Sequence, residues 1–207
     1  MNRCCAVFCG GDPVSRETAE GYLESCVCSI AADSGYLLAD KLGVKVDTVI
    51  GDFDSAREPS GVEVIRFPVR KDDTDLMLAL KEGLGRGYDR FVIFGATGGR
   101  LDHTFAAVQG LEFLLDRGAS GVIVSDNETA EMFLPGCYGF EYREGFTLSL
   151  FAVTEKVTGL SLKGTKYDGE GLTLERGFPL GVSNAVTAPA AEIIFESGRL
   201  LAVRSRL

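Results

Sequence analysis

The stretch FVIFGATGGRLDHTFAAVQGLEFLL, residues 91–115, contains the pattern that decides the fold. Its first four residues are apolar and β-branched or aromatic, which predicts a buried strand, and a glycine-rich run at residues 95–99 follows directly. From Thr104 the apolar spacing is that of a helix reaching Leu115. A strand, a glycine turn and a helix in this order form the repeating unit of a parallel sheet covered by helices.

The same alternation continues on both sides of this stretch. We expect further strands at residues 4–8, 27–32, 46–50, 62–67 and 121–125, and helices after Ser15 and at 36–42 and 75–84. Gly43 is a typical left-handed cap at the end of the second helix. This pattern predicts an N-terminal α/β domain, residues 1–134, with a mostly parallel sheet and helices on both faces, as in Rossmann-like folds.

The pattern changes near Leu134-Pro135-Gly136. Beyond it, glycine-marked turns separate short alternating runs at 147–153, 157–162, 172–174, 182–187, 192–196 and 200–203. Ser197-Gly198 is typical of a hairpin turn between the last two runs. Residues 138–207 are therefore predicted to form a small all-β sandwich or barrel.

Composition excludes several classes of protein. The chain has 207 residues, of which 45% are hydrophobic and 25% charged, values of an ordinary globular protein. A net charge of −9 argues against nucleic acid or an anionic membrane as the main partner. No apolar run approaches the ~20 residues needed to span a bilayer. The six cysteines lack the spacing of a zinc or redox motif, so we expect reduced thiols and a cytoplasmic protein.

Four short clusters contain the residues that can do chemistry. They are Ala32-Asp33-Ser34-Gly35, Gly51-Asp52-Phe53-Asp54-Ser55, Lys71-Asp72-Asp73-Thr74-Asp75 and Gly98-Gly99-Arg100-Leu101-Asp102-His103. Each follows an expected strand or opens an expected helix. Because ligands of open α/β sheets bind outside the carboxyl ends of the strands, we expect the clusters to meet there.

Carboxylates dominate these clusters. Asp52 and Asp54, two residues apart on extended chain, point the same way and can share one Mg²⁺, although the same residues are common in ordinary turns. Asp72 and Asp75 begin a helix, where they can hold metal or simply cap the helix and interact with its dipole.

The remaining groups suit phosphate. Lys71 and Arg100 are cations that bind phosphate, and the amides of Gly98 and Gly99 can cradle an anion at a helix N-terminus. His103 is the sole histidine of the chain, and a lone histidine is more often structural than catalytic. These residues together indicate Mg²⁺-dependent phosphoryl chemistry without naming the acceptor.

The four clusters, followed by Gly164-Thr165-Lys166-Tyr167 and Gly181-Val182-Ser183-Asn184, resemble the thiamine pyrophosphokinase family in order and register. The resemblance implies an α/β nucleotide domain followed by a β-sandwich. It also implies transfer of the pyrophosphoryl group of ATP to the hydroxyl of thiamine, giving thiamine diphosphate and AMP. The expected enzyme is a homodimer, with each active site between the α/β domain of one subunit and the sandwich of the other.

The resemblance also implies roles for individual residues. Metal ligands would be Asp52, Asp54, Asp72, Asp75 and Asp102, and the catalytic residues Asp72, Asp75, Asp102 and Arg100. ATP would be bound by Asp33, Lys71, Thr74, Gly98, Gly99 and Arg100, and thiamine by Tyr167, Ser183 and Asn184. Whether Asp72 or Asp102 accepts the thiamine hydroxyl proton stays open. Strand packing of Tyr167 and turn chemistry of Ser183-Asn184 are the structural alternatives.

Three residues depart from the family pattern. Ser34 replaces a usual glycine, Ala107 a usual asparagine and Ala185 a usual glutamate. A left-handed backbone at position 34 would be strained with serine. Two other functions also use such residues: a metal-dependent nucleotide-sugar transferase using Asp52 and Asp54, and a non-catalytic nucleotide or thiamine sensor. The sequence thus predicts an ATP- and Mg²⁺-binding domain at 1–134 and a thiamine-binding, dimerising domain at 138–207.

Overall fold

The computed structural model describes residues 3–52, 60–67 and 73–207 of the chain. The chain divides into two compact units, Met1–Asp126 and Asn127–Leu207. The first unit is a mixed α/β structure and the second contains strands throughout.

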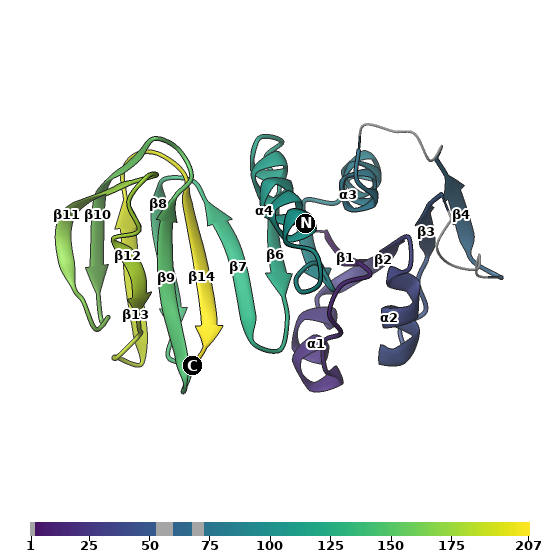
Figure 1. Cartoon of the computed structure of the whole chain (residues 1–207), viewed down its shortest axis with the longest axis horizontal. Coiled ribbons are helices and arrows are strands. Elements are labelled where there is room, and N and C mark those ends of the chain that lie inside the picture. Colours follow the sequence, from purple (N-terminus) through teal and green to yellow (C-terminus); the bar gives the residue numbers. More distant parts are fainter. Residues whose placement is uncertain (1–2, 53–59, 68–72) are drawn as a thin grey trace. The chain divides into compact units, whose positions relative to one another are not determined.

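A parallel sheet forms the centre of the N-terminal unit (Figure 1). Its strands lie in the order β6-β5-β1-β2-β3-β4, and every pairing among them is parallel. Their bounds are β1 Cys4–Phe8, β2 Cys26–Ala32, β3 Thr48–Gly51, β4 Glu63–Arg66, β5 Arg90–Phe94 and β6 Ser120–Val124. From β1 the chain builds outward through β2 to β4, then returns to place β5 on the other side of β1. Successive strands are therefore added on one side of β1 up to β4 and on its other side from β5 onward.

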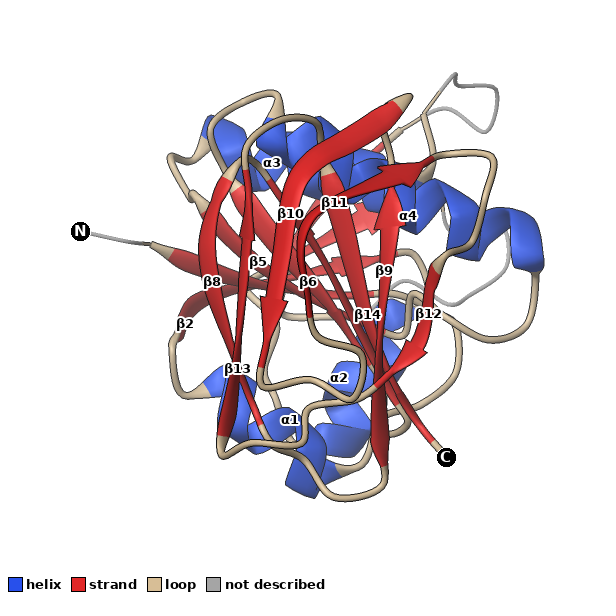
Figure 2. Ribbon diagram, turned by 90° about the vertical axis from the view of Figure 1, so that its left-hand side faces the viewer, coloured by secondary structure: helices blue, strands red, loops and turns tan. Residues whose placement is uncertain are grey.

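Helices cover both faces of this sheet: α1 (Arg16–Leu23), α2 (Gly35–Leu42), α3 (Asp75–Gly85) and α4 (Leu101–Leu115). Figure 2 shows α1 and α2 on one side of the strands and α3 and α4 on the other. Alternate residues of β1, such as Ala6 and Phe8, share a core with α1 and α2. All of β1 is buried, as the uninterrupted apolar run predicts for a strand covered twice.

The helix ends have local causes. The Ser15 side chain caps α1 by accepting from the Thr18 amide, and Gly43 ends α2 with a φ of 73°, as predicted. The helix α4 begins at Leu101, earlier than the predicted Thr104. Its first turn buries nothing, since Leu101 is 71% exposed, and the buried side begins only at Ala107. Apolar spacing therefore carries no signal for that turn.

The C-terminal unit is built from two antiparallel layers. Strands β12, β9, β14 and β7 are neighbours in one layer, and β11, β10, β13 and β8 in the other. Their bounds are β7 Glu128–Phe133, β8 Gly136–Glu141, β9 Phe146–Ala152, β10 Lys156–Lys163, β11 Gly169–Glu175, β12 Gly181–Asn184, β13 Ala190–Phe195 and β14 Leu200–Arg206.

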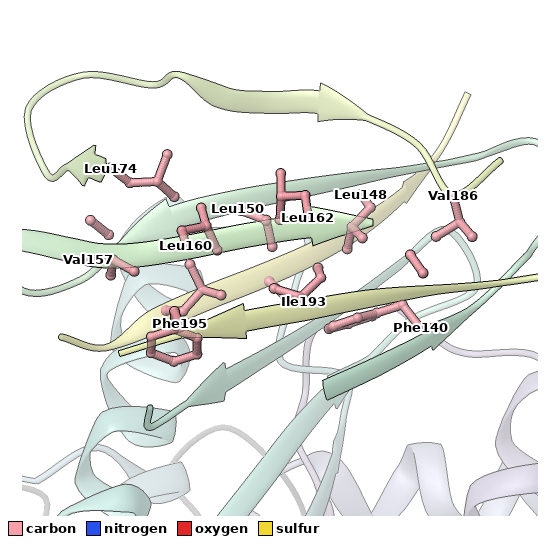
Figure 3. Packing of buried hydrophobic residues seen from close by; sticks show 14 residues of the cluster. Phe140, Leu148, Leu150, Val157, Leu160, Leu162, Leu174, Val186, Ile193 and Phe195 are labelled. Carbon is pink, nitrogen blue, oxygen red and sulfur yellow. The ribbon is translucent and has the colours of Figure 1, made fainter. Parts of the chain in front are cut away.

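One hydrophobic core joins these two layers. Leu148 and Leu150 of β9 pack in the same cluster as Leu160 of β10 and Ile193 of β13 (Figure 3). Along β13, buried and exposed residues alternate strictly. Two sheets that share a core through alternate residues form a β-sandwich.

The sequence pattern does not predict strands β7 and β8. β7 reads ETAEMF, with glutamates among its apolar residues, and β8 contains two glycines, so neither shows a clear strand signal. Because β7 pairs with β14, the C-terminal unit begins at Asn127, ahead of the change of pattern at Leu134. Within the described ranges, no helix has the length and apolarity to cross a membrane.

Candidate active site

A cleft of about 510 Å³ opens at the carboxyl edge of the parallel sheet. Its walls come from the segments after β1, β2 and β5 and from the first turns of α3 and α4. This is the reversal point between β1 and β5, where open α/β sheets leave a crevice for ligands. Residues from three of the four predicted clusters line it: Asp33 and Ser34, Thr74 and Asp75, and Gly98, Gly99, Arg100 and His103.

The segments after β1 and β5 are joined by backbone hydrogen bonds. The amide of Cys9 donates to the Phe94 carbonyl at 2.8 Å, and that of Gly11 to the Gly95 carbonyl at 2.7 Å. The next bond runs from the Asp12 amide to Thr97, at 2.9 Å. These hydrogen bonds fix the backbone at the bottom of the cleft. The amides of these segments that make no such bond are therefore held in place and can face a ligand.

Two glycines make this floor possible. Gly95 and Gly98 have φ values of 66° and 79°, in the region that disfavours side chains. A Cβ on Gly95 would lie 2.4 Å from the Cys9 carbonyl oxygen, and one on Gly98 would lie 2.0 Å from the Asp12 carboxylate. The backbone conformation therefore requires glycine at these positions, and the glycines leave this part of the cleft free of side chains.

The cluster after β2 has one residue in a rare conformation. Asp33 has a φ of 46°, and its amide donates to the Ile50 carbonyl at 2.7 Å. Ser34, which replaces a glycine of the family pattern, has an ordinary φ of −65° and no strain. Gly35 approaches β1 so closely that a Cβ would lie 2.0 Å from the Phe8 carbonyl oxygen. The predicted strain at Ser34 is absent, because the left-handed residue is Asp33.

The residues at the start of α3 have different partners. Thr74 caps this helix, with its Oγ1 accepting from the Met77 amide at 3.2 Å. The N-cap is thus Thr74, whereas Asp75 lies in the first turn, where its charge can interact with the helix dipole; Asp72 lies outside the described residues. Asp73 is held by Lys81, whose Nζ lies 2.8 and 2.7 Å from the two carboxylate oxygens. Lys81 thus offsets the negative charge of Asp73.

Arg100 and Asp102 form an ion pair at the start of α4. The Arg100 Nη2 lies 2.5 Å and Nε 3.1 Å from the two Asp102 oxygens, and the His103 amide donates to the same carboxylate at 3.0 Å. The Arg100 guanidinium lowers the pKa of Asp102. Both side chains are mostly exposed, at 71% and 63%, so solvent screens the pair.

The predicted metal ligands are only partly within the described chain. Asp75 lines the cleft, and Asp52 follows β3 at the edge where Gly51 contacts Asp33. Asp54, Lys71 and Asp72 lie outside the described residues. Among residues 3–52, 60–67 and 73–207, no three His, Cys, Asp or Glu side chains are grouped so as to hold a metal ion.

The predicted thiamine residues lie together in the C-terminal unit but differ in kind. Asn184 is 5% exposed, and its Oδ1 accepts from the amides of Tyr167 at 3.0 Å and Ala185 at 2.8 Å. Its Nδ2 donates to Thr165 Oγ1 at 3.2 Å and to the Tyr167 carbonyl at 3.3 Å. Tyr167 is 57% exposed and Ser183, also exposed, has a left-handed φ of 60°. Asn184 therefore holds the loop that presents the Tyr167 ring.

Sequence reasoning missed part of the cleft wall. Cys9, Gly10 and Gly11 line it, yet Gly10-Gly11-Asp12-Pro13 gives only a turn signal. The paired glycines at a strand end were the available signal for close backbone approach to a ligand. Ala107, which replaces the family's asparagine, is 1% exposed and also lines the cleft, so this wall carries a methyl group instead of an amide.

The N-terminal unit is a parallel sheet with a glycine-lined cleft at its reversal point, and the C-terminal unit is a β-sandwich. This class of two-unit protein has a cleft that suits an anionic ligand. Residues 19–122 match the family model "Thiamin pyrophosphokinase, catalytic domain", and residues 140–200 match "Thiamin pyrophosphokinase, vitamin B1 binding domain". The chain belongs to the thiamin pyrophosphokinase family.

Individual relatives agree with this membership. The thiamine pyrophosphokinase of Bacillus subtilis is 29% identical over 193 residues, covering 89% of this chain and 90% of the relative. Its crystal structure, at 27% identity, has a TM-score of 0.90 and covers 99% of this chain and 100% of that one. Thiamin pyrophosphokinase from Candida albicans shares the fold with a TM-score of 0.81 at 15% identity, over 99% and 89% of the two chains.

Proposed function

We propose that this protein transfers the pyrophosphoryl group of ATP to the hydroxyl of thiamine, producing thiamine diphosphate and AMP. The observation that carries the proposal is the cleft, where the glycine floor, Arg100 and Asp75 face one space at the carboxyl edge of the sheet. Membership of the thiamin pyrophosphokinase family supports it through both the catalytic and the vitamin B1 binding domain.

The residues around the cleft suit the phosphates of ATP. The amides of Gly98 and Gly99 lie just before α4, where the positive end of the helix dipole favours an anion. We propose that Arg100 at the same position pairs with phosphate oxygens and in doing so gives up part of its hold on Asp102. Binding of ATP and freeing of the Asp102 carboxylate are thus coupled in this arrangement.

The donor set fits Mg²⁺. Magnesium needs only one or two carboxylates when phosphate oxygens and water complete its octahedron. We propose that Asp75 in the cleft wall, Asp52 at the end of β3, and Asp54, Asp72 and Asp102 supply these carboxylates. When bound, the metal would neutralise phosphate charge and favour attack on the β-phosphorus.

The reaction needs a base for the thiamine hydroxyl. Asp72 and Asp102 remain the candidates. The ion pair with Arg100 lowers the pKa of Asp102, so this carboxylate is charged but a weaker base while the pair persists. Release of Arg100 to the phosphates would strengthen Asp102 as a base at the moment ATP is bound.

Thiamine would bind to the C-terminal unit. Tyr167 offers an exposed aromatic ring, and Lys166 Nζ already lies 5.1 Å from its centroid, so the ring accepts a cation. We propose that the thiazolium of thiamine uses this ring and that Ser183 lies beside it, while Asn184 positions the loop. We also propose a homodimer whose active sites combine the two kinds of unit, in the cytoplasm.

Product analysis tests this proposal. The protein is incubated with ATP, Mg²⁺ and thiamine, and nucleotides and thiamine esters are separated by chromatography. We expect AMP and thiamine diphosphate in equal amounts. Formation of ADP with thiamine monophosphate, or no turnover with thiamine, would refute it. A sugar transferase would instead release a nucleoside diphosphate from a nucleotide sugar, and a sensor would bind without turnover.

A further inference from the structure

Two cysteines meet at the amino edge of the parallel sheet, opposite the edge that forms the cleft. Cys4 begins β1 and Cys26 begins β2, and the two residues are direct partners across these strands. Their sulfur atoms lie 3.0 Å apart. Ser25 Oγ donates to the Cys4 sulfur at 3.7 Å, and Cys26 Sγ lies 3.6 Å from the Tyr22 carbonyl oxygen.

A register shift produces this meeting. Cys4 pairs with Cys26, whereas Cys5 pairs with Cys28, so Val27 is an extra residue in β2 at this point. Such a bulge lets Cys26 and Cys28 face opposite sides of the sheet, although they are two residues apart. Cys4 and Cys26 accordingly belong to the core beneath α1, together with Tyr22.

The two members of the pair differ: Cys4 is the activated thiol and Cys26 is the one that solvent reaches. The Cys26 thiol donates toward Cys4 and lowers the pKa of Cys4 to about 6, helped by Ser25 and by the positive charge of Arg90. Cys26 is half-buried and follows Ser25, which is exposed, while Cys4 is 2% exposed. A small reagent can therefore reach Cys26, and the sulfur that shares its proton lies directly behind it.

Cys5 and Cys28 form a second cysteine pair, with which the Cys4–Cys26 pair can be compared. These two also pair across β1 and β2, and the Cys5 thiol lowers the pKa of Cys28 to about 6. They are 0% and 7% exposed, however, and lie on the other face of the sheet. Each pair thus contains one buried thiol with a lowered pKa, but only the first pair has a member, Cys26, that is partly open to solvent.

We propose that Cys4 and Cys26 form an oxidisable dithiol, which a peroxide converts into an intrachain disulfide. The sulfur of Cys26, the accessible member, attacks one peroxide oxygen and becomes a sulfenic acid. The O–O bond breaks, and the departing hydroxide takes the thiol proton and leaves as water. The second sulfur then displaces the hydroxyl, which forms the S–S bond and releases a second water. The two thiols lose two protons and two electrons, which reduce hydrogen peroxide to two waters.

The backbone already suits this bond. Directly paired residues on neighbouring strands are about 4.8 Å apart, within the range of Cα separations that a disulfide spans. The two sulfur atoms, now 3.0 Å apart, must approach by about 1 Å to reach bonding distance. No residue of the cleft has to move.

Peptide mapping of the peroxide-treated, folded chain tests the proposal. We expect two of the six thiols to disappear, with a single linked pair of peptides containing Cys4 and Cys26, which dithiothreitol separates again. The variant Cys137→Ser, which removes the exposed cysteine, should behave like the unchanged protein. Cys26→Ser should yield no linked peptides.

Other results would overturn the proposal. These are an unchanged thiol count at a peroxide dose that oxidises free cysteine in the same tube, a disulfide between Cys5 and Cys28, or a link between two chains through Cys137. Because the mapping uses the unchanged protein, the test stands even if Cys26→Ser fails to fold.

Discussion

Replacing Asn184 by alanine should weaken both the C-terminal unit and its proposed binding of thiamine. The change removes four hydrogen bonds, two accepted by Oδ1 and two donated by Nδ2. Each is worth about 0.5–1.5 kcal/mol net. Because the Tyr167 side is open to water, which replaces some of these bonds, we expect a total loss of about 2–3 kcal/mol in unfolding free energy. For a chain of this size that corresponds to roughly 4–10 °C in Tm.

Urea denaturation and steady-state kinetics measure the two effects. The loop at Tyr167 loses its anchor, so KM for thiamine should rise on the order of tenfold, equivalent to about 1.4 kcal/mol, while KM for ATP stays unchanged. Ser183→Ala is the matched control for stability, because its side chain is exposed and the hydrogen bond from its amide to Ser149 Oγ at 3.1 Å is kept. Unchanged stability in Asn184→Ala, or an equal loss in both variants, would refute the reasoning.

The other predictions concern the cleft. Asp75→Asn should reduce kcat at least about 100-fold with a small stability loss, because asparagine keeps the size of the side chain and the interaction of the Asp75 charge with the dipole of α3 is worth about 0.3–1 kcal/mol; full activity in steady-state assays would contradict a ligand role. Lys81→Ala removes the ion-pair partner of Asp73. The affinity for ATP, measured by calorimetry, should fall while the KM for thiamine stays constant. Equal changes in ATP affinity and thiamine KM would argue against a specific role of Lys81 in the ATP site. Arg100→Ala should raise the pKa of Asp102 toward its ordinary value, so that the carboxylate takes up a proton at higher pH in an NMR titration; an unchanged titration would show that the pair does not form in solution.

Much of the α/β fold could be predicted from the sequence because its strands are buried on both faces. The strand Cys4–Phe8 was predicted to the residue, and Gly43 marked a helix end by its backbone alone. The first turn of α4 could not be predicted, because exposed Leu101 gives no periodic signal. Strand β7 was missed since its burial depends on pairing with β14, far along the chain.

The sequence indicated which loops form the candidate site, but not which interactions the individual residues make there. Strand ends with Asp, Gly and Arg indicated the carboxyl edge, and the cleft lies there. The sequence could not show that Lys81 holds Asp73, or that Asn184 reaches Thr165 across 19 residues, because these contacts arise only in three dimensions. Asn184 thus positions the Tyr167 loop, and its contact with thiamine stays a prediction.

The central claim is that a pyrophosphoryl group moves intact from ATP to thiamine. It is tested most directly with ATP labelled at the β-phosphorus, in the presence of Mg²⁺ and thiamine. We predict that the label appears in thiamine diphosphate in an amount equal to the AMP formed, and that unlabelled AMP is the sole nucleotide product. Label that remains in ADP, with thiamine carrying a single unlabelled phosphate, would contradict the claim.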